Sequence, residues 1–197
     1  MNKERLTAFS DGVIAIIITI MVLELKVPHG ATFEALRSVT PVFLSYVLSF
    51  VYVGIYWNNH HHMLHATGEV TGGILWANLN LLFWLSLFPF ATAWMGEYHF
   101  EALPSALYGA VLFMAAIAFL ILQQTIIASQ GPDSLLRRAV GCDRKGKISP
   151  VLYLAGMAAA FWSPRLAQGI YFVVAVIWLV PDRRIERVLV AHDHSST

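Results

Sequence analysis

Long apolar runs separated by short polar segments are the first pattern along this chain. A helix needs about 20 mostly apolar residues to cross the hydrocarbon layer of a membrane. Runs of this length lie near residues 6–26, 39–60, 72–95 and 105–129. Pro28 closes the first run, Gly72 opens the third and Pro104 precedes the fourth, as expected where helices end and begin. The pattern predicts four membrane-spanning helices, and Pro89 predicts a kink in the third.

The end of the chain is less regular. A polar segment at about 130–149 is predicted to be a cytoplasmic loop, and the tail at about 190–197 is predicted to be disordered. Between them lie two shorter apolar runs, near 150–162 and 166–181, each only marginally long enough to span. Two short spanning helices, a re-entrant hairpin and one long broken helix all fit these runs.

The positions of the basic residues favour six spans with a cytoplasmic start. Cytoplasmic loops of membrane proteins carry an excess of Lys and Arg. Six spans place ten of these residues inside: Lys3, Arg5, Arg137, Arg138, Arg144, Lys145, Lys147, Arg183, Arg184 and Arg187. Lys26, Arg37 and Arg165 lie outside. A single crossing over 150–181 would separate basic segments that belong on one side, so the charges favour two short helices or a re-entrant pair.

Composition places the chain in the membrane class. Hydrophobic residues make up 57% of the chain and charged residues only 13%, against about 25% charged in soluble domains. The net charge of +1 and the lack of a long basic tract give no indication of nucleic-acid binding. Cys142 is the single cysteine, which excludes an intrachain disulfide and makes no zinc site alone. The first run is longer than a signal-peptide core and no small-x-small site follows it, so it is predicted to be retained.

The first span has two chemically different sides. At 100° per residue, one stripe contains Phe9, Gly12, Ile16, Ile20, Leu23 and Val27, with Thr19 on its border. Asp11 points about 140° away from Ile16 by the same geometry. An unpartnered charge at membrane depth costs about 2.5–3.5 kcal/mol on insertion scales. Ser10 and Asp11 are therefore expected to face polar groups on neighbouring helices.

The next two spans supply such groups at the same membrane face. The second ends in "YWNNHHHMLH" and the third begins with "ILWANLN". These segments offer Trp57, Asn58, Asn59, His60, His61 and His62, and then Trp76, Asn78 and Asn80. From topology alone, a structural network and a transport site are about equally expected here.

The first span contains the motif Arg5-x-x-x-Phe9-Ser10-Asp11-Gly12-Val13-x-Ala15-Ile16-x-x-Thr19, and Leu23, Leu25 and Pro28 follow it. This pattern resembles the signature of the bacterial branch of the transmembrane protein 175 potassium channels. The segments "YWNNHH" and "WANLNLLFWLSLFPFATAWMGE" also resemble that family. The resemblance implies an all-α homotetramer of six-helix subunits, with the first helix lining a central pore. It implies no carbonyl-lined pore loop, and the chain contains no Thr-Val-Gly-Tyr-Gly filter.

The resemblance also assigns roles to residues. It implies a pore constriction at Ile16, Ile20 and Leu23, with Thr19 as a hydroxyl layer. These residues belong to the apolar stripe found above. It further implies that Arg5, Phe9, Ser10 and Asp11 anchor the first helix to Trp57, Asn59, His60 or His61, and Asn78. Asp11 is thus interpreted as a helix anchor in preference to an ion ligand.

The predicted function is a potassium-permeable cation channel in the bacterial inner membrane, with cytoplasmic termini and a hydrophobic constriction as gate. Its expected partners are other copies of itself, membrane lipid and potassium ions; no cofactor, enzyme activity or nucleic acid is expected. A secondary transporter is the main alternative, although the chain shows no internal repeat. A metal enzyme is the weaker one: His61 and His65 have i, i+4 spacing, but other histidine boxes are lacking.

Overall fold

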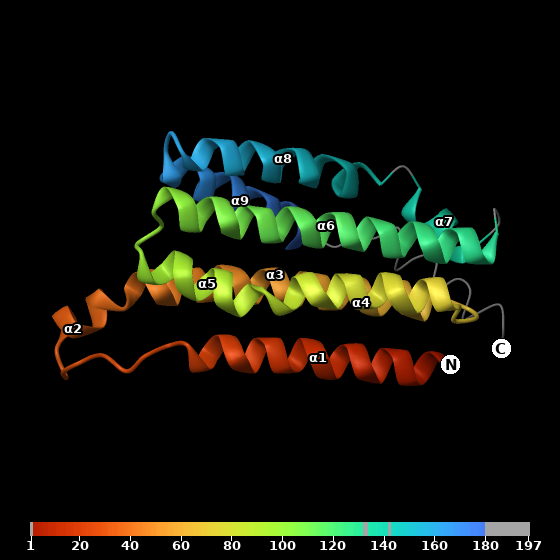
Figure 1. Cartoon of the computed structure of the whole chain (residues 1–197), viewed down its shortest axis with the longest axis horizontal. Helices are drawn as coiled ribbons and strands as arrows, with labels where there is room; N and C mark the ends of the chain where they lie inside the picture. The colour runs from red at the N-terminus through yellow and green to blue at the C-terminus, as the bar shows by residue number, and fades with distance from the viewer. Residues whose placement is uncertain (1, 132–133, 142, 180–197) are drawn as a thin grey trace.

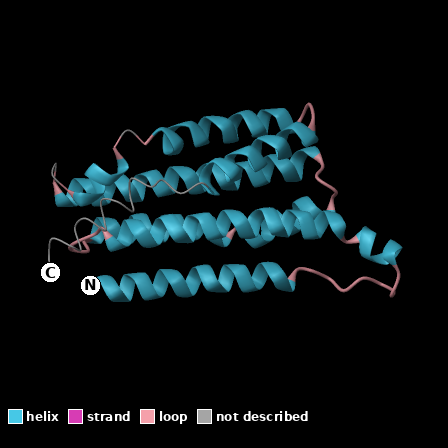
Figure 2. Cartoon of the chain, turned by 180° about the vertical axis from the view of Figure 1, so that it is seen from behind, coloured by secondary structure: helices cyan, strands magenta, loops and turns pink. Residues whose placement is uncertain are grey.

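The protein is a bundle of long antiparallel helices (Figure 1). The computed structural model describes residues 2–131, 134–141 and 143–179. No strand occurs in these ranges, and the helices are joined by short loops (Figure 2). The helices are α1 (Lys3–Leu23), α2 (Phe33–Ser38), α3 (Thr40–His65), α4 (Gly72–Ser86), α5 (Phe88–Glu97), α6 (Ala102–Gln130), α7 (Leu135–Val140), α8 (Arg144–Ala160) and α9 (Pro164–Leu179).

The helices are arranged in successive layers. α1 packs on α3, α4 and α5, and α4 and α5 pack in turn on α6. α8 packs on α6 and α9, so that α1 and α8 lie on opposite sides of the bundle (Figure 1). One side of α1 and one side of α8 are therefore left without neighbours from this chain.

The four predicted spans are confirmed. α1, α3, the combined segment Gly72–Glu97 and α6 are each long and apolar enough to cross a membrane. α1 runs from Lys3 to Leu23, because Asn2 caps its first turn and the polar residues from Glu24 onward follow it. Val27, expected on the apolar stripe of this helix, lies instead in the loop beyond it. α3 continues to His65, so the histidine run is helical.

The expected break in the third span is present. α4 ends at Ser86 and α5 begins at Phe88, with Pro89 in the first turn of α5. Pro89 has no backbone N–H to donate, so the regular ladder stops here. The Leu87 N–H turns instead to the Trp84 carbonyl at 3.3 Å, and the Leu87 carbonyl accepts from Ala91 at 3.0 Å.

The segment predicted as a polar loop at about 130–149 is in part helical. It contains α7 and the first turns of α8, and Ser134 and Asp143 cap their N-termini. Apolar periodicity gave no sign of these short or basic helical turns, because their helicity depends on caps and on contact with α6. α2 was also missed, because its six residues depend on the Thr32 cap and on contact with α3. α8 and α9 form an antiparallel pair beside α6 (Figure 1), and the tail predicted at about 190–197 lies outside the described residues.

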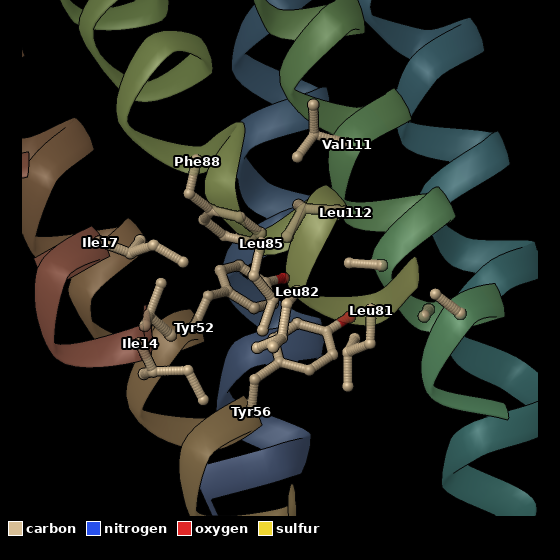
Figure 3. Packing of buried hydrophobic residues seen from close by; sticks show 14 of the residues in the cluster. Ile14, Ile17, Tyr52, Tyr56, Leu81, Leu82, Leu85, Phe88, Val111 and Leu112 are labelled. Carbon is tan, nitrogen blue, oxygen red and sulfur yellow. The ribbon is translucent and has the colours of Figure 1, made fainter. Parts of the chain in front are cut away.

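Aromatic rings fill the centre of the bundle (Figure 3). Phe88 contacts the rings of Tyr52, Tyr56 and Tyr108 at centroid separations of 6.1–6.5 Å. The Tyr52 hydroxyl donates to the backbone carbonyl of Tyr171. Internal partners are required here because hydrocarbon supplies none to polar groups.

Candidate functional site

α1 buries one narrow stripe, and the rest of its surface is half-buried or exposed. The buried residues are Leu6, Ser10, Ile14, Ile17 and Met21, which recur every three or four positions. Ile14 and Ile17 point into the aromatic core (Figure 3). Packing on a single stripe fixes the rotation of α1 about its axis, because the other sides of the helix have no comparable contact.

The residues expected at the pore constriction all lie on the exposed side of α1. The exposed fraction is 58% for Ile16, 42% for Ile20 and 79% for Leu23. Thr19 lies among them and is also exposed. Its hydroxyl donates to the carbonyls of Ala15 and Ile16, at 3.1 and 2.8 Å. The proton is thus used within the helix, and the oxygen lone pairs face outward.

A buried chain of hydrogen bonds ties α1 to α3 and α4. Asn78 on α4 donates from Nδ2 to the Ser10 hydroxyl at 2.9 Å. Its Oδ1 lies 2.7 Å from Nε2 of His60 on α3. The Ser10 hydroxyl in turn donates to the Leu6 carbonyl at 2.9 Å. All three polar side chains are fully buried.

The arrangement fixes the protonation pattern of His60. Since the Asn78 amide nitrogen donates to Ser10, the amide oxygen must be the atom that faces His60, and it accepts. Nε2 of His60 therefore carries the proton. Nδ1 is then an acceptor, and it is buried without a hydrogen-bond partner among the described residues. The sequence left His60 and His61 as alternative partners of the α1 motif; in the structure His60 contacts Asn78, which in turn contacts Ser10 of that motif.

Asp11 makes a separate contact at the edge of the same region. Nε1 of Trp57 on α3 donates to Oδ1 of Asp11 at 3.0 Å. Asp11 is half-buried and Trp57 is 45% exposed, so this pair lies nearer the surface than the Asn78 chain. Asp11 thus faces α3, whereas Ile16 and Leu23 do not. The expected division of α1 into two sides is present in the structure.

Other residues assigned to the anchor do not join it. Arg5 is exposed and makes no side-chain hydrogen bond or ion pair with a described residue, and the apolar Phe9 is 52% exposed. The Asn59 amide donates to the Ile55 carbonyl of its own helix at 2.8 Å. His61 is exposed and lies in ring contact with Trp57 at 6.1 Å. The anchoring role of these residues stays a prediction.

The structure also shows a contact that the sequence analysis missed. Nζ of Lys3 donates to the backbone carbonyl of His65 at 2.6 Å, which joins the start of α1 to the end of α3. The last carbonyls of a helix lack internal partners and carry partial negative charge, so a nearby cation is favourable there. The sequence could have indicated this contact, because Lys3 begins one predicted span on the same side of the membrane on which the next predicted span ends.

The histidines at the end of α3 lie in ring contact with one another. Within the described residues, no three His, Cys, Asp or Glu side chains come close enough to hold one metal ion. His61 and His65 instead face each other as rings with centroids 6.5 Å apart.

A family model and individual related proteins point to the same family. The family model described as endosomal/lysosomal potassium channel TMEM175 matches residues 5–89. A Chryseobacterium sp. (strain P1-3) protein named as a potassium channel is 55% identical over 96% of this chain and 98% of its own length. A potassium channel of Chamaesiphon minutus is 32% identical over 87% of this chain and 91% of its own length.

A solved structure agrees in fold. The crystal structure of a lysosomal potassium-selective channel TMEM175 homologue from Chamaesiphon minutus superposes with a TM-score of 0.81 at 28% identity. The match covers 90% of this chain and 96% of that one. The family model's residues 5–89 include α3, α4 and all but the first two residues of α1, the helices that form the site described above. The chain belongs to the TMEM175 family of potassium channels, in its bacterial branch.

Proposed function

We propose that this protein is a potassium-permeable cation channel in which α1 of each subunit lines a central pore. Relatives that match nearly the whole chain are named potassium channels, which marks a transport protein and not an enzyme. The observation that carries the assignment to α1 is its exposed apolar side. Ile16, Ile20 and Leu23 are exposed, although the polar side chain of Ser10 is buried. A free subunit would leave this side unpartnered, and a ring of four subunits would enclose it.

The proposed assembly is a homotetramer of six-helix subunits, with both termini in the cytoplasm of a bacterial cell and the channel in its inner membrane. α8 has 17 residues and is about 25 Å long at 1.5 Å per residue, close to the hydrocarbon thickness of about 30 Å. α9 has 16 described residues and lies beside it. This length supports two short spanning helices over a re-entrant hairpin.

The gate follows from the chemistry of the exposed side. A narrow ring of aliphatic side chains excludes water and so blocks ions, which require water or equivalent ligands. A slightly wider ring passes the ion that gives up hydration most easily, and potassium holds water less tightly than sodium. The outward oxygen lone pairs of Thr19 would offer ligands at the level between Ile16 and Ile20.

Reconstitution into liposomes with a potassium gradient tests the function. We expect potassium flux well above that of empty liposomes, without a requirement for a co-transported solute. Flux that is fixed in ratio to a second solute would instead establish the secondary transporter, and flux equal to empty liposomes would contradict the channel.

Substitutions on α1 test the gate. Ile16→Asn should lower the potassium/sodium permeability ratio because a polar ring wets the constriction, and Leu23→Ala should raise the conductance because it widens the ring. Val22→Ala is the matched control, because Val22 is exposed at 43% but lies on the Asp11 side of α1. Unchanged permeation in both constriction variants would contradict the assignment.

A further inference from the structure

A group of exposed basic side chains lies where α7 is followed by α8. Arg137 and Arg138 lie in the last turn of α7, and Arg144 and Lys147 lie in the first turns of α8. All four side chains are exposed. None of them makes an ion pair or side-chain hydrogen bond with another described residue. We call these four residues the basic cluster.

The described residues at the start of α8 carry little negative charge that could compensate the basic cluster. The first turn of α8 contains no acidic residue, and cations are disfavoured there by the positive end of the helix dipole. Asp143, the N-cap residue of α8, carries a carboxylate beside these residues in the sequence. Its oxygens already accept from the Gly146 N–H at 2.9 Å and from the Gln123 amide at 3.3 Å. An anion from outside the chain would therefore be stabilised at this place by both the side chains and the dipole.

The depth of the basic cluster in the membrane can be estimated from α6. The contact between Gln123 and Asp143 puts the start of α8 level with Gln123. Gln123 lies 21 residues after Ala102, the first residue of α6, and hence about 31 Å along its axis. The hydrocarbon layer is about 30 Å thick. The start of α8 therefore lies at a membrane surface, at the level of lipid headgroups.

The opposite end of α8 lies at the other surface. Phe161 is 67% exposed and Trp162 is 93% exposed, immediately after α8 ends at Ala160. Exposed aromatic residues are enriched at membrane–water interfaces. This placement agrees with the depth that α6 gives for the start of α8.

An exposed apolar stripe continues from the basic cluster along α8. Ile148, Val151 and Leu154 are 51%, 62% and 48% exposed and recur every three residues. Arg144 and Lys147 precede them on the same side of the helix. A ligand that fits this surface has an anionic head followed by an apolar chain.

We propose that the basic cluster and the stripe on α8 bind an anionic phospholipid, with the phosphate on the cations and an acyl chain along Ile148, Val151 and Leu154. α8 lies on the opposite side of the subunit from α1 (Figure 1), so this surface faces lipid if α1 lines the pore. That last step rests on the proposed function. Clusters of Lys and Arg at a membrane surface attract anionic lipids, and the attraction grows with each added cation.

Lipid titration of the purified full-length protein in detergent, followed by native mass spectrometry, tests the proposal. Dioleoyl phosphatidylglycerol is the probe and dioleoyl phosphatidylcholine the neutral comparison. The variant R138Q/R144Q/K147Q removes two arginines and one lysine from the basic cluster. The matched control K26Q/R37Q/R165Q removes the same residue types from exposed positions at the opposite surface.

We expect the first variant to bind phosphatidylglycerol about tenfold more weakly or worse, the control to stay within twofold of the unmodified protein, and phosphatidylcholine binding to be the same in all three. Glycerol phosphate at millimolar concentration should not displace the lipid. The proposal would be overturned if both variants lost phosphatidylglycerol binding equally, if the first variant lost none, or if glycerol phosphate displaced the lipid.

Size-exclusion elution checks that each variant assembles. If the triple variant fails to assemble, R137Q/R138Q on α7 replaces it in the binding measurement. The readout needs no ion flux, so it is independent of the channel assay.

Discussion

Asn78 connects three helices through a single amide group. Its nitrogen donates to Ser10 on α1 and its oxygen accepts from His60 on α3, while its own backbone belongs to α4. Both contacts are fully buried, and hydrocarbon supplies no alternative partner. This residue therefore sets the relative rotation of three helices at one level of the bundle.

Asn78→Leu should destabilise the subunit because it leaves the Nε2–H of His60 buried without an acceptor. Interhelical hydrogen bonds in membrane proteins contribute on the order of 0.6–2 kcal/mol. We expect the midpoint of thermal unfolding in detergent to fall by about 2–8 °C. Asn80→Leu is the matched control, because Asn80 lies on the same helix and its side chain makes no hydrogen bond with a described residue. An equal shift in both variants would contradict this role of Asn78.

Asp11 is bound to Trp57 and lies away from the apolar side of α1. Asp11→Ala should therefore reduce the yield of the proposed tetramer while leaving the potassium/sodium permeability ratio of the channels that assemble unchanged. Trp57→Phe should reduce the yield in the same way, and the double variant should be little worse than either single one. Size-exclusion chromatography and reversal potentials provide the two measurements. Fully assembled Asp11→Ala tetramers with altered selectivity would show that the carboxylate contacts the ion.

At the scale of helices, glycines allow close packing where no hydrophobic effect drives association. Membrane helices associate through van der Waals contact, so small residues mark their closest approaches. A Cβ at Gly109 on α6 or Gly156 on α8 would overlap with the side chain of Tyr171 on α9. A Cβ at Gly96 on α5 would likewise overlap with the side chain of Ser45 and the backbone of Val42, both on α3. These contacts hold the layers of the bundle together.

Gly156→Ala should destabilise the α8–α9 pair, because the buried Tyr171 ring must move to admit a methyl group. Overpacking of this kind costs about 1–3 kcal/mol, which exceeds the gain of about 1 kcal/mol in helix propensity. Gly169→Ala on α9 is the control, since a Cβ there meets nothing within 4 Å. It should leave the unfolding midpoint unchanged or raise it. An unchanged unfolding midpoint in Gly156→Ala would show that α8 and α9 can move apart without loss of stability.

At the scale of the whole molecule, the proposed tetramer would account for the exposed side of α1. α1 lies at one edge of the subunit (Figure 1), where copies related by fourfold symmetry would bring their Leu23 side chains toward a common axis. The opposite edge, with α8, would face lipid. The order of the layers thus predicts which surface is central and which is peripheral.

Cysteine cross-linking tests this order. On a Cys142→Ser background, which removes the single native cysteine, Leu23→Cys should form disulfide-linked dimers under mild oxidation in membranes. Val151→Cys is the control, because Val151 is 62% exposed on α8 at the opposite edge. It should stay monomeric on a denaturing gel. Cross-linking of the α8 variant alone would reverse the proposed arrangement.

The spans, the break at Pro89 and the two sides of α1 could all be predicted from the amino-acid sequence. These features are local: a span needs a long enough apolar run, proline lacks a donor, and helical periodicity places Ile16 and Asp11 on different sides. Charge placement likewise predicts an orientation with cytoplasmic termini, because the basic residues gather in a few segments.

Which polar groups come into contact depends on how the helices pack, and this could not be predicted from the sequence. His60 and His61 differ by one position and hence by about 100° of rotation, so contact with Asn78 depends on how α3 is turned against α4. The pairing of Lys3 with the His65 carbonyl depends in the same way on where α1 and α3 begin and end. Helix rotation and relative depth are set by packing across the whole bundle, and no single stretch of sequence contains them.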